Sequence, residues 1–213
     1  MRSKKSERDV LRWRLTRQRR HFQFGRAILV GWLAGLLAVV FQLSLHKAES
    51  VRIFFFQLLN AWSFGWIFII SICVSIGGLS SWMTQRFAPE ASGSGIPHVK
   101  GVLLRLRTLK WRKILPVKYF GGVLAIGTGF SLGREGPTVQ MGAVAGKIIA
   151  QWLRVPRRLH GQLIAAGAGA GLAAAFNAPL AGFIFVIEEL RREFSPLTYG
   201  TALISAVLAD FVT

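Results

Sequence analysis

Long stretches without a charged side chain constrain this chain more than any other feature. Residues 27–45 and 53–85 contain no Asp, Glu, Lys or Arg, and residues 159–187 carry His160 as their single titratable group. About 20 consecutive apolar residues span a bilayer as an α-helix. Helices also satisfy every backbone hydrogen bond within one segment, as a bilayer requires. We therefore predict an all-α integral membrane protein that crosses the bilayer several times.

The positive charge of the chain is large, but it lies in two clusters beside the apolar segments. The formal net charge is +18, with ten of the 27 Lys and Arg in residues 1–26 and seven in residues 100–118. Basic residues beside spans remain on the cytoplasmic side and contact lipid headgroups. We therefore expect the lipid bilayer, and no nucleic acid, as the partner of these clusters.

The first 26 residues are predicted to be a separate segment of the chain. Apolar and basic residues alternate there, which favours a basic, cytoplasmic, amphipathic helix on the membrane surface. A disordered tail over residues 1–8 is the alternative. Residues 27–213 are then predicted to form the transmembrane domain.

Two membrane spans are predicted in the first part of that domain. The first covers residues 27–45, where Gly31 and Gly35 form a GxxxG pair that allows another helix to approach closely. A polar loop is expected over residues 46–50, and the second span over residues 61–86. Two passes from a cytoplasmic N-terminus return the chain to the cytoplasm, in agreement with the second basic cluster.

After the second span, glycine and proline interrupt the apolar segments repeatedly. The interruptions read GSGIP (93–97), GREGP (133–137), NAP (177–179) and SP (195–196). Proline suits the first turn of a helix, so each interruption predicts a new helix start. Broken, re-entrant helices are tolerated at membrane depth where their free N–H groups line a cavity. Because helix N-termini favour anions, this pattern indicates a transporter site for a small anion.

Glu135 is an acidic residue in the middle of nearly uncharged chain. An ionisable residue at membrane depth is a functional hypothesis by default. Burial opposes its ionisation, whereas Arg134 and nearby N–H donors favour it. Glu135 is therefore a candidate to take up and release a proton, or to occupy an anion site. The alternative is a structural Arg134–Glu135 pair, which is disfavoured because adjacent helical residues do not face each other.

Two further polar groups leave alternatives open. The hydroxyl of Ser94 is either an anion donor or ordinary turn chemistry. Glu188 and Glu189 either lie at the membrane surface beside Arg191 and Arg192, or one faces inward while the other pairs with an arginine. The four histidines lack the spacing of metal ligands, and no nucleophile–base motif is visible. Neither enzyme activity, nor a cofactor, nor a metal is expected.

Three of these segments together resemble the CLC family of chloride channels, including the voltage-gated ones, and chloride/proton antiporters. They are GSGIPHVKGVL (93–103), GREGPTVQMGA (133–143) and AAAFNAPLAGFIFVIEEL (173–190). The resemblance covers roughly residues 25–213. It implies the first half of a CLC-type inverted repeat, a polytopic bundle with re-entrant helices.

The resemblance also implies roles for particular residues. Glu135 corresponds to the gate that blocks the outer anion site when ionised and leaves it when protonated. Glu189 corresponds to the inner acid of the proton pathway, which Glu135 completes. The implied chloride-binding residues are Ser94, Gly95, Arg134, Glu135 and Gly136.

One departure from the family pattern limits what the chain is expected to do alone. The family builds each pore from two inverted halves, and the second half, with its GxFxP motif and tyrosine, does not occur in this sequence. We expect chloride transport across the plasma or inner membrane, as chloride/proton exchange in the complete protein, which the family forms as a homodimer. The alternative is a half-length, non-conducting subunit that associates with a partner CLC chain.

Overall fold

The protein is described by a computed structural model in which the described residues form helices and the turns and loops that join them. The structure describes residues 2–60, 64–191 and 195–213, with side chains for residues 22–59, 64–191 and 195–213. The helices follow in the order α1 (Arg2–Asn60), α2 (Gly65–Phe87), η1 (Pro89–Ala91), α3 (Ile96–Leu103), α4 (Trp111–Gly127), α5 (Glu135–Trp152), α6 (Arg157–Phe176), α7 (Pro179–Phe185), η2 (Val186–Arg191) and α8 (Pro196–Val212).

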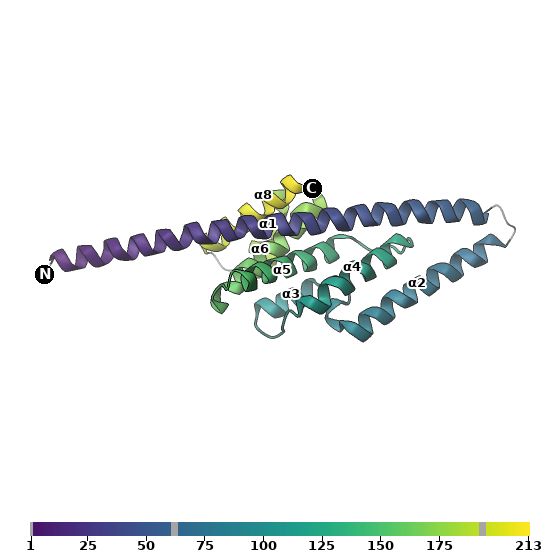
Figure 1. Ribbon diagram of the computed structural model, residues 1–213, viewed down its shortest axis with the longest axis horizontal. Helices are drawn as coiled ribbons and strands as arrows, with labels where there is room; N and C mark the ends of the chain where they lie inside the picture. The colour runs from purple at the N-terminus through teal and green to yellow at the C-terminus, as the bar shows by residue number, and fades with distance from the viewer. Residues whose placement is uncertain (1, 61–63, 192–194) are drawn as a thin grey trace.

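Helix α1 runs along the length of the molecule, and its middle and far end pack against α2, α4, α5, α6 and α8 (Figure 1). The polar loop predicted over residues 46–50 is wrong, because α1 continues through it. That stretch contains neither glycine nor proline to stop a helix. Its polar groups are satisfied on the helix surface instead: Arg52 pairs with Glu49 at 3.2 Å, and the Ser50 hydroxyl donates to the carbonyl of His46 at 2.9 Å.

The spans agree with a multi-pass membrane protein. Within the described part of the chain, three helical segments are long and apolar enough to cross a bilayer: Phe22–Leu59, Gly65–Phe87 and Arg157–Phe176. The second predicted span corresponds to α2, and its first residues, 61–63, lie outside the described residues. The backbone passes through residue 26 as one helix, so the membrane-surface position of residues 1–26 stays a prediction.

The GxxxG pair of α1 is a helix contact, as predicted, and its partner is α8. A Cβ atom on Gly31 would lie 2.6 Å from the carbonyl oxygen of Ser205, and one on Gly35 would lie 2.9 Å from that of Ala209. The Ser205 hydroxyl donates to the carbonyl of Ala27 at 2.8 Å. Small residues thus let the first and last helices of the chain approach closely.

Each glycine- and proline-rich interruption is followed by a helix, which confirms the predicted helix starts. Helix α3 begins at Ile96, α5 at Glu135, α7 at Pro179 and α8 at Pro196. The small-residue stretch over residues 161–182 packs α6 tightly on α5 and α7, with glycines of the three helices in backbone contact. The largest apolar cluster then joins α3, α4, α5 and α6 into one body, which fixes two of the helix starts relative to each other.

Candidate functional site

The segment Ser92–Gly95, called the serine loop below, leads into α3. Gly93 and Gly95 have φ of 63° and 81°, a left-handed conformation that favours glycine. Gly95 is also buried, and a Cβ atom there would lie 2.5 Å from the amide oxygen of Gln140. The Ser94 side chain is exposed, and its Oγ accepts a bond from the Ile96 N–H at 3.4 Å. Turn chemistry is therefore present at Ser94, while its hydroxyl proton stays available to an anion.

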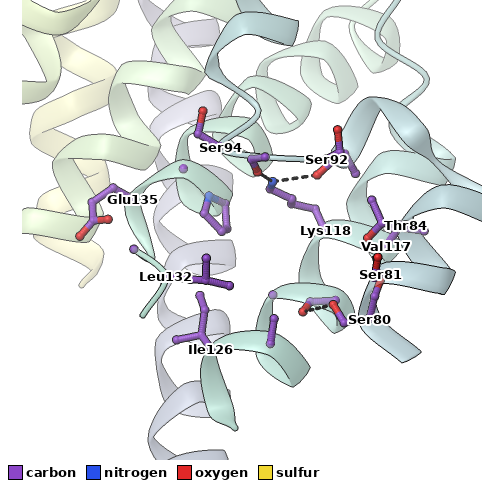
Figure 2. Close-up of a pocket in the computed structure, with 18 of the residues that line it drawn as sticks. Ser80, Ser81, Thr84, Ser92, Ser94, Val117, Lys118, Ile126, Leu132 and Glu135 are labelled. Carbon is purple, nitrogen blue, oxygen red and sulfur yellow. Dashed lines mark hydrogen bonds between the residues drawn. The ribbon is translucent and has the colours of Figure 1, made fainter. Parts of the chain in front are cut away.

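The second interruption places Glu135 at the first position of α5. Its carboxylate folds back against Gly133, and Figure 2 shows it directed away from Lys118 and Ser94. Arg134 is exposed, and in the described part of the chain no ion pair joins it to Glu135. The alternative of a structural Arg134–Glu135 pair is therefore wrong, and the Glu135 carboxylate is not held by its neighbour.

The two interruptions meet in space. A Cβ atom on Gly136 would lie 2.8 Å from both the Cα and the carbonyl oxygen of Ser94. A cavity of about 660 Å³ opens beside this contact, and Ser94, Glu135 and Gly136 all line it (Figure 2). The N-terminal ends of α3 and α5 thus converge on one cavity, where their free N–H groups favour an anion.

The remaining predicted anion-site residues lie at different places around this cavity. Gly95, the last residue of the serine loop, is buried and does not line the cavity. Arg134 lines a second cavity of about 360 Å³, together with Arg52 and Glu49 of α1. Glu135 lines both cavities, so its side chain lies at the boundary between them.

The serine loop can lie this close to Gly136 only because glycine has no side chain. We expect Gly136→Ala to destabilise the protein by about 1–3 kcal/mol, as overpacking does in a close-packed interior. Gly78→Ala is the matched control, because Gly78 is also helical and a Cβ atom there meets nothing within 4 Å. Thermal unfolding in detergent should show a lower midpoint for Gly136→Ala alone. Equal midpoints for the two variants would contradict the contact.

Lys118 of α4 was missed as a site residue and was counted in the basic cluster of residues 100–118. It is buried, with 6% of its surface exposed, and it lines the larger cavity. Its ammonium donates to the carbonyls of Ala91 at 2.9 Å and Gly93 at 2.6 Å (Figure 2). Both acceptors are neutral, so the cavity retains positive charge that suits an anion. The signal was available, because Lys118 stands in the apolar run ILPVKYFGG just as Glu135 stands in its own.

Just before the serine loop, the backbone and the side chain of Glu90 both accept hydrogen bonds. Its carbonyl accepts a bond from the amide of the fully buried Gln140 at 2.9 Å. Its carboxylate accepts one from Lys110 at 3.1 Å. A backbone hydrogen bond and the Lys110 ammonium hold the pKa of Glu90 below its usual range. Gln140 was also missed, because its role depends on a contact 50 residues away in the sequence.

Glu189 lies apart from the cavity, on the η2 segment that continues α7. Its carboxylate pairs with Lys100 of α3 at 2.5 Å, and Glu188 is exposed. The two acids therefore do point to different environments. A lysine of α3 thus contacts the more buried of the two acids.

Comparisons with known proteins match most of the chain to one family. The sequence model of the family described as Voltage gated chloride channel matches residues 76–213. The H(+)/Cl(-) exchange transporter ClcA of Vibrio vulnificus (strain YJ016) is 42% identical over 194 residues, covering 87% of this chain and 41% of the relative. ClcA of Vibrio cholerae (strain ATCC 39541) is 40% identical over 213 residues, covering 98% of this chain and 46% of the relative.

Two solved structures share the fold. A slow cyanobacterial Cl-/H+ antiporter superposes with a TM-score of 0.84 at 38% identity, covering 89% of this chain and 45% of that one. A eukaryotic CLC transporter superposes with a TM-score of 0.77 at 27% identity, covering 93% and 38% respectively. The chain thus spans less than half the length of the curated relatives and structures that it matches.

Proposed function

This chain belongs to the voltage gated chloride channel family, and we propose that it supplies the first half of a chloride/proton exchange path. The observation that carries the proposal is the contact between Gly136 and Ser94 at the cavity. It brings two helix N-termini, one hydroxyl and one acid to a single place, although the motifs lie 40 residues apart. The relatives named as exchange transporters support the choice of chloride and protons.

The proposed anion site uses dipoles rather than a bound counter-charge. Free N–H groups at the starts of α3 and α5 face the anion, and the Ser94 hydroxyl donates to it. The Lys118 ammonium adds a favourable potential, but its bonds to the carbonyls of Ala91 and Gly93 keep it from binding chloride directly. A site of this kind holds a monovalent anion without trapping it.

Glu135 is the proposed gate, and its position at the first turn of α5 explains how it acts. When ionised, its carboxylate competes with chloride for the free N–H groups at the start of α5. When protonated, it loses that attraction and returns to a position such as the one observed against Gly133. Because the ionised carboxylate and chloride compete for the same N–H groups, proton uptake by Glu135 is coupled to the movement of chloride through the site. Glu189 is the proposed acid that receives protons on the inner side.

Orientation and assembly are proposed from the charge pattern and the family. The basic residues near the N-terminus favour a cytoplasmic N-terminus, which accessibility labelling of single cysteines on either side of vesicles can check. A homodimer in the plasma or inner membrane is the proposed assembly, and light scattering in detergent measures its mass.

Chloride binding tests the proposed site. We define the paired transporter as this chain co-expressed with the remaining part of Vibrio cholerae ClcA, which is the part that this chain does not match. Ser94→Ala should weaken chloride binding by calorimetry about fivefold, as expected for the loss of one hydrogen bond of about 1 kcal/mol. Ser131→Ala, an exposed serine outside the cavity, should bind as the unmodified protein does. Equal affinities for all three proteins would reject the assigned site.

A further inference from the structure

Lys100 and Glu189 form the shortest of the described ion pairs, although they lie 89 residues apart. The Lys100 Nζ and the Glu189 Oε1 are 2.5 Å from each other. Their side chains are 35% and 46% exposed, so water reaches both groups. An opposite charge at this distance stabilises the ionised form of a carboxyl group. Partial exposure limits the size of that effect.

Helix α3 joins this pair directly to the proposed anion site. It is eight residues long, it begins after Gly95 of the serine loop, and Lys100 lies in its last turn. Because Ser94 precedes the helix and Lys100 is near its end, a displacement of the serine loop moves the cation that faces Glu189. Helix α3 thus directly follows the serine loop of the proposed anion site. It also carries Lys100, which pairs with Glu189 of the proposed proton pathway.

Lys100 is the cation that α3 presents to Glu189, and the other packed elements offer different groups. Helix α7 has no titratable side chain. His160 of α6 is already bonded, with Nε2 at 2.8 Å from the Val155 carbonyl and Nδ1 at 3.4 Å from Lys147. The remaining titratable or charged groups on α6 and η2 are Arg157, Arg158, Glu188 and Arg191.

We propose that Lys100 is a positioning residue for the proton pathway, which holds Glu189 in its ionised form and delays proton uptake from the inner side. This inference rests on the proposed function for its role in transport, but the pairing itself does not. In the exchange path, Glu189 accepts a proton more readily once its bond to Lys100 is released. Proton entry is therefore linked to the position of α3, and through it to the serine loop.

The experiment titrates Glu189 itself by infrared spectroscopy on this chain in nanodiscs. The difference between the unmodified protein and Glu189→Gln identifies the carboxyl band. In Lys100→Met the band should titrate at a pH higher by roughly 0.5–1 unit, the size expected for a partly exposed pair. Lys100→Arg should titrate as the unmodified protein does. Lys113→Met is the matched control, because Lys113 is an exposed lysine on α4, and it should titrate as the unmodified protein does.

The outcomes separate this inference from the proposed function. An unchanged midpoint in Lys100→Met overturns the role of Lys100, whatever the protein transports. A shifted midpoint should be accompanied, in the paired transporter, by an equal shift in the inner pH at which proton transport is half-maximal. If the band shifts while the paired transporter moves chloride without protons, the pairing stands and the exchange function fails.

Discussion

Replacing Glu135 with Gln is expected to uncouple proton transport from chloride transport in the paired transporter. The amide has the size of the carboxylate, but it can neither bind the transported proton nor compete with chloride as an anion. Proton transfer by a positioned side chain contributes about 10²–10⁴ in rate, so we expect proton flux to fall at least a hundredfold. Chloride flux should persist. Both fluxes are measured in liposomes with a chloride electrode and a pH electrode.

Glu49→Gln is the matched control for this experiment. Glu49 also lines the smaller cavity beside Glu135, but it is exposed and pairs with Arg52 on the surface of α1. Its substitution should leave the ratio of protons to chloride unchanged. If Glu135→Gln retained the ratio of the unmodified protein, Glu135 would not be the gate.

Replacing Lys118 with Met is expected to remove most chloride binding. Methionine keeps the length of the side chain but loses the charge and the two hydrogen bonds that the ammonium donates. The carbonyls of Ala91 and Gly93 then lose their partner, at a cost of about 1–3 kcal/mol for a buried group. Because the serine loop is no longer held and the cavity loses its positive charge, we expect chloride affinity to fall about tenfold to a hundredfold.

Calorimetric titration with chloride measures this effect, and limited proteolysis reports the mobility of the serine loop. Lys113→Met is the control, because Lys113 lies on the same helix and is exposed. It should bind chloride as the unmodified protein does. Unchanged affinity in Lys118→Met would show that the buried ammonium has no part in the anion site.

Local sequence predicted the helix starts well because proline and glycine act locally. The starts at Ile96, Glu135, Pro179 and Pro196 follow from the shape of the proline ring and the freedom of glycine. The same reasoning failed over residues 46–50, where polarity was taken as a loop signal. Polar residues without a helix breaker continue a helix whose surface can satisfy them, as the Glu49–Arg52 pair does.

The contacts that build the site were not predictable in the same way. The approach of Gly136 to Ser94 and the bonds of Lys118 to the serine loop join segments that only the tertiary fold brings together. The residue types were visible in the sequence, and the apolar run around Lys118 indicated its burial, but the carbonyls that accept its hydrogen bonds were not predictable. The pairing of Lys100 with Glu189 likewise depends on the packing of α3 against η2.

Chloride-driven proton movement in the paired transporter tests the central proposal most directly. Liposomes are loaded with chloride, the membrane potential is set to zero, and the only gradient is that of chloride. We predict that protons enter the liposomes as chloride leaves and build up a proton gradient, and that Glu135→Gln abolishes this proton movement. Chloride efflux without proton entry in the unmodified protein would contradict the account.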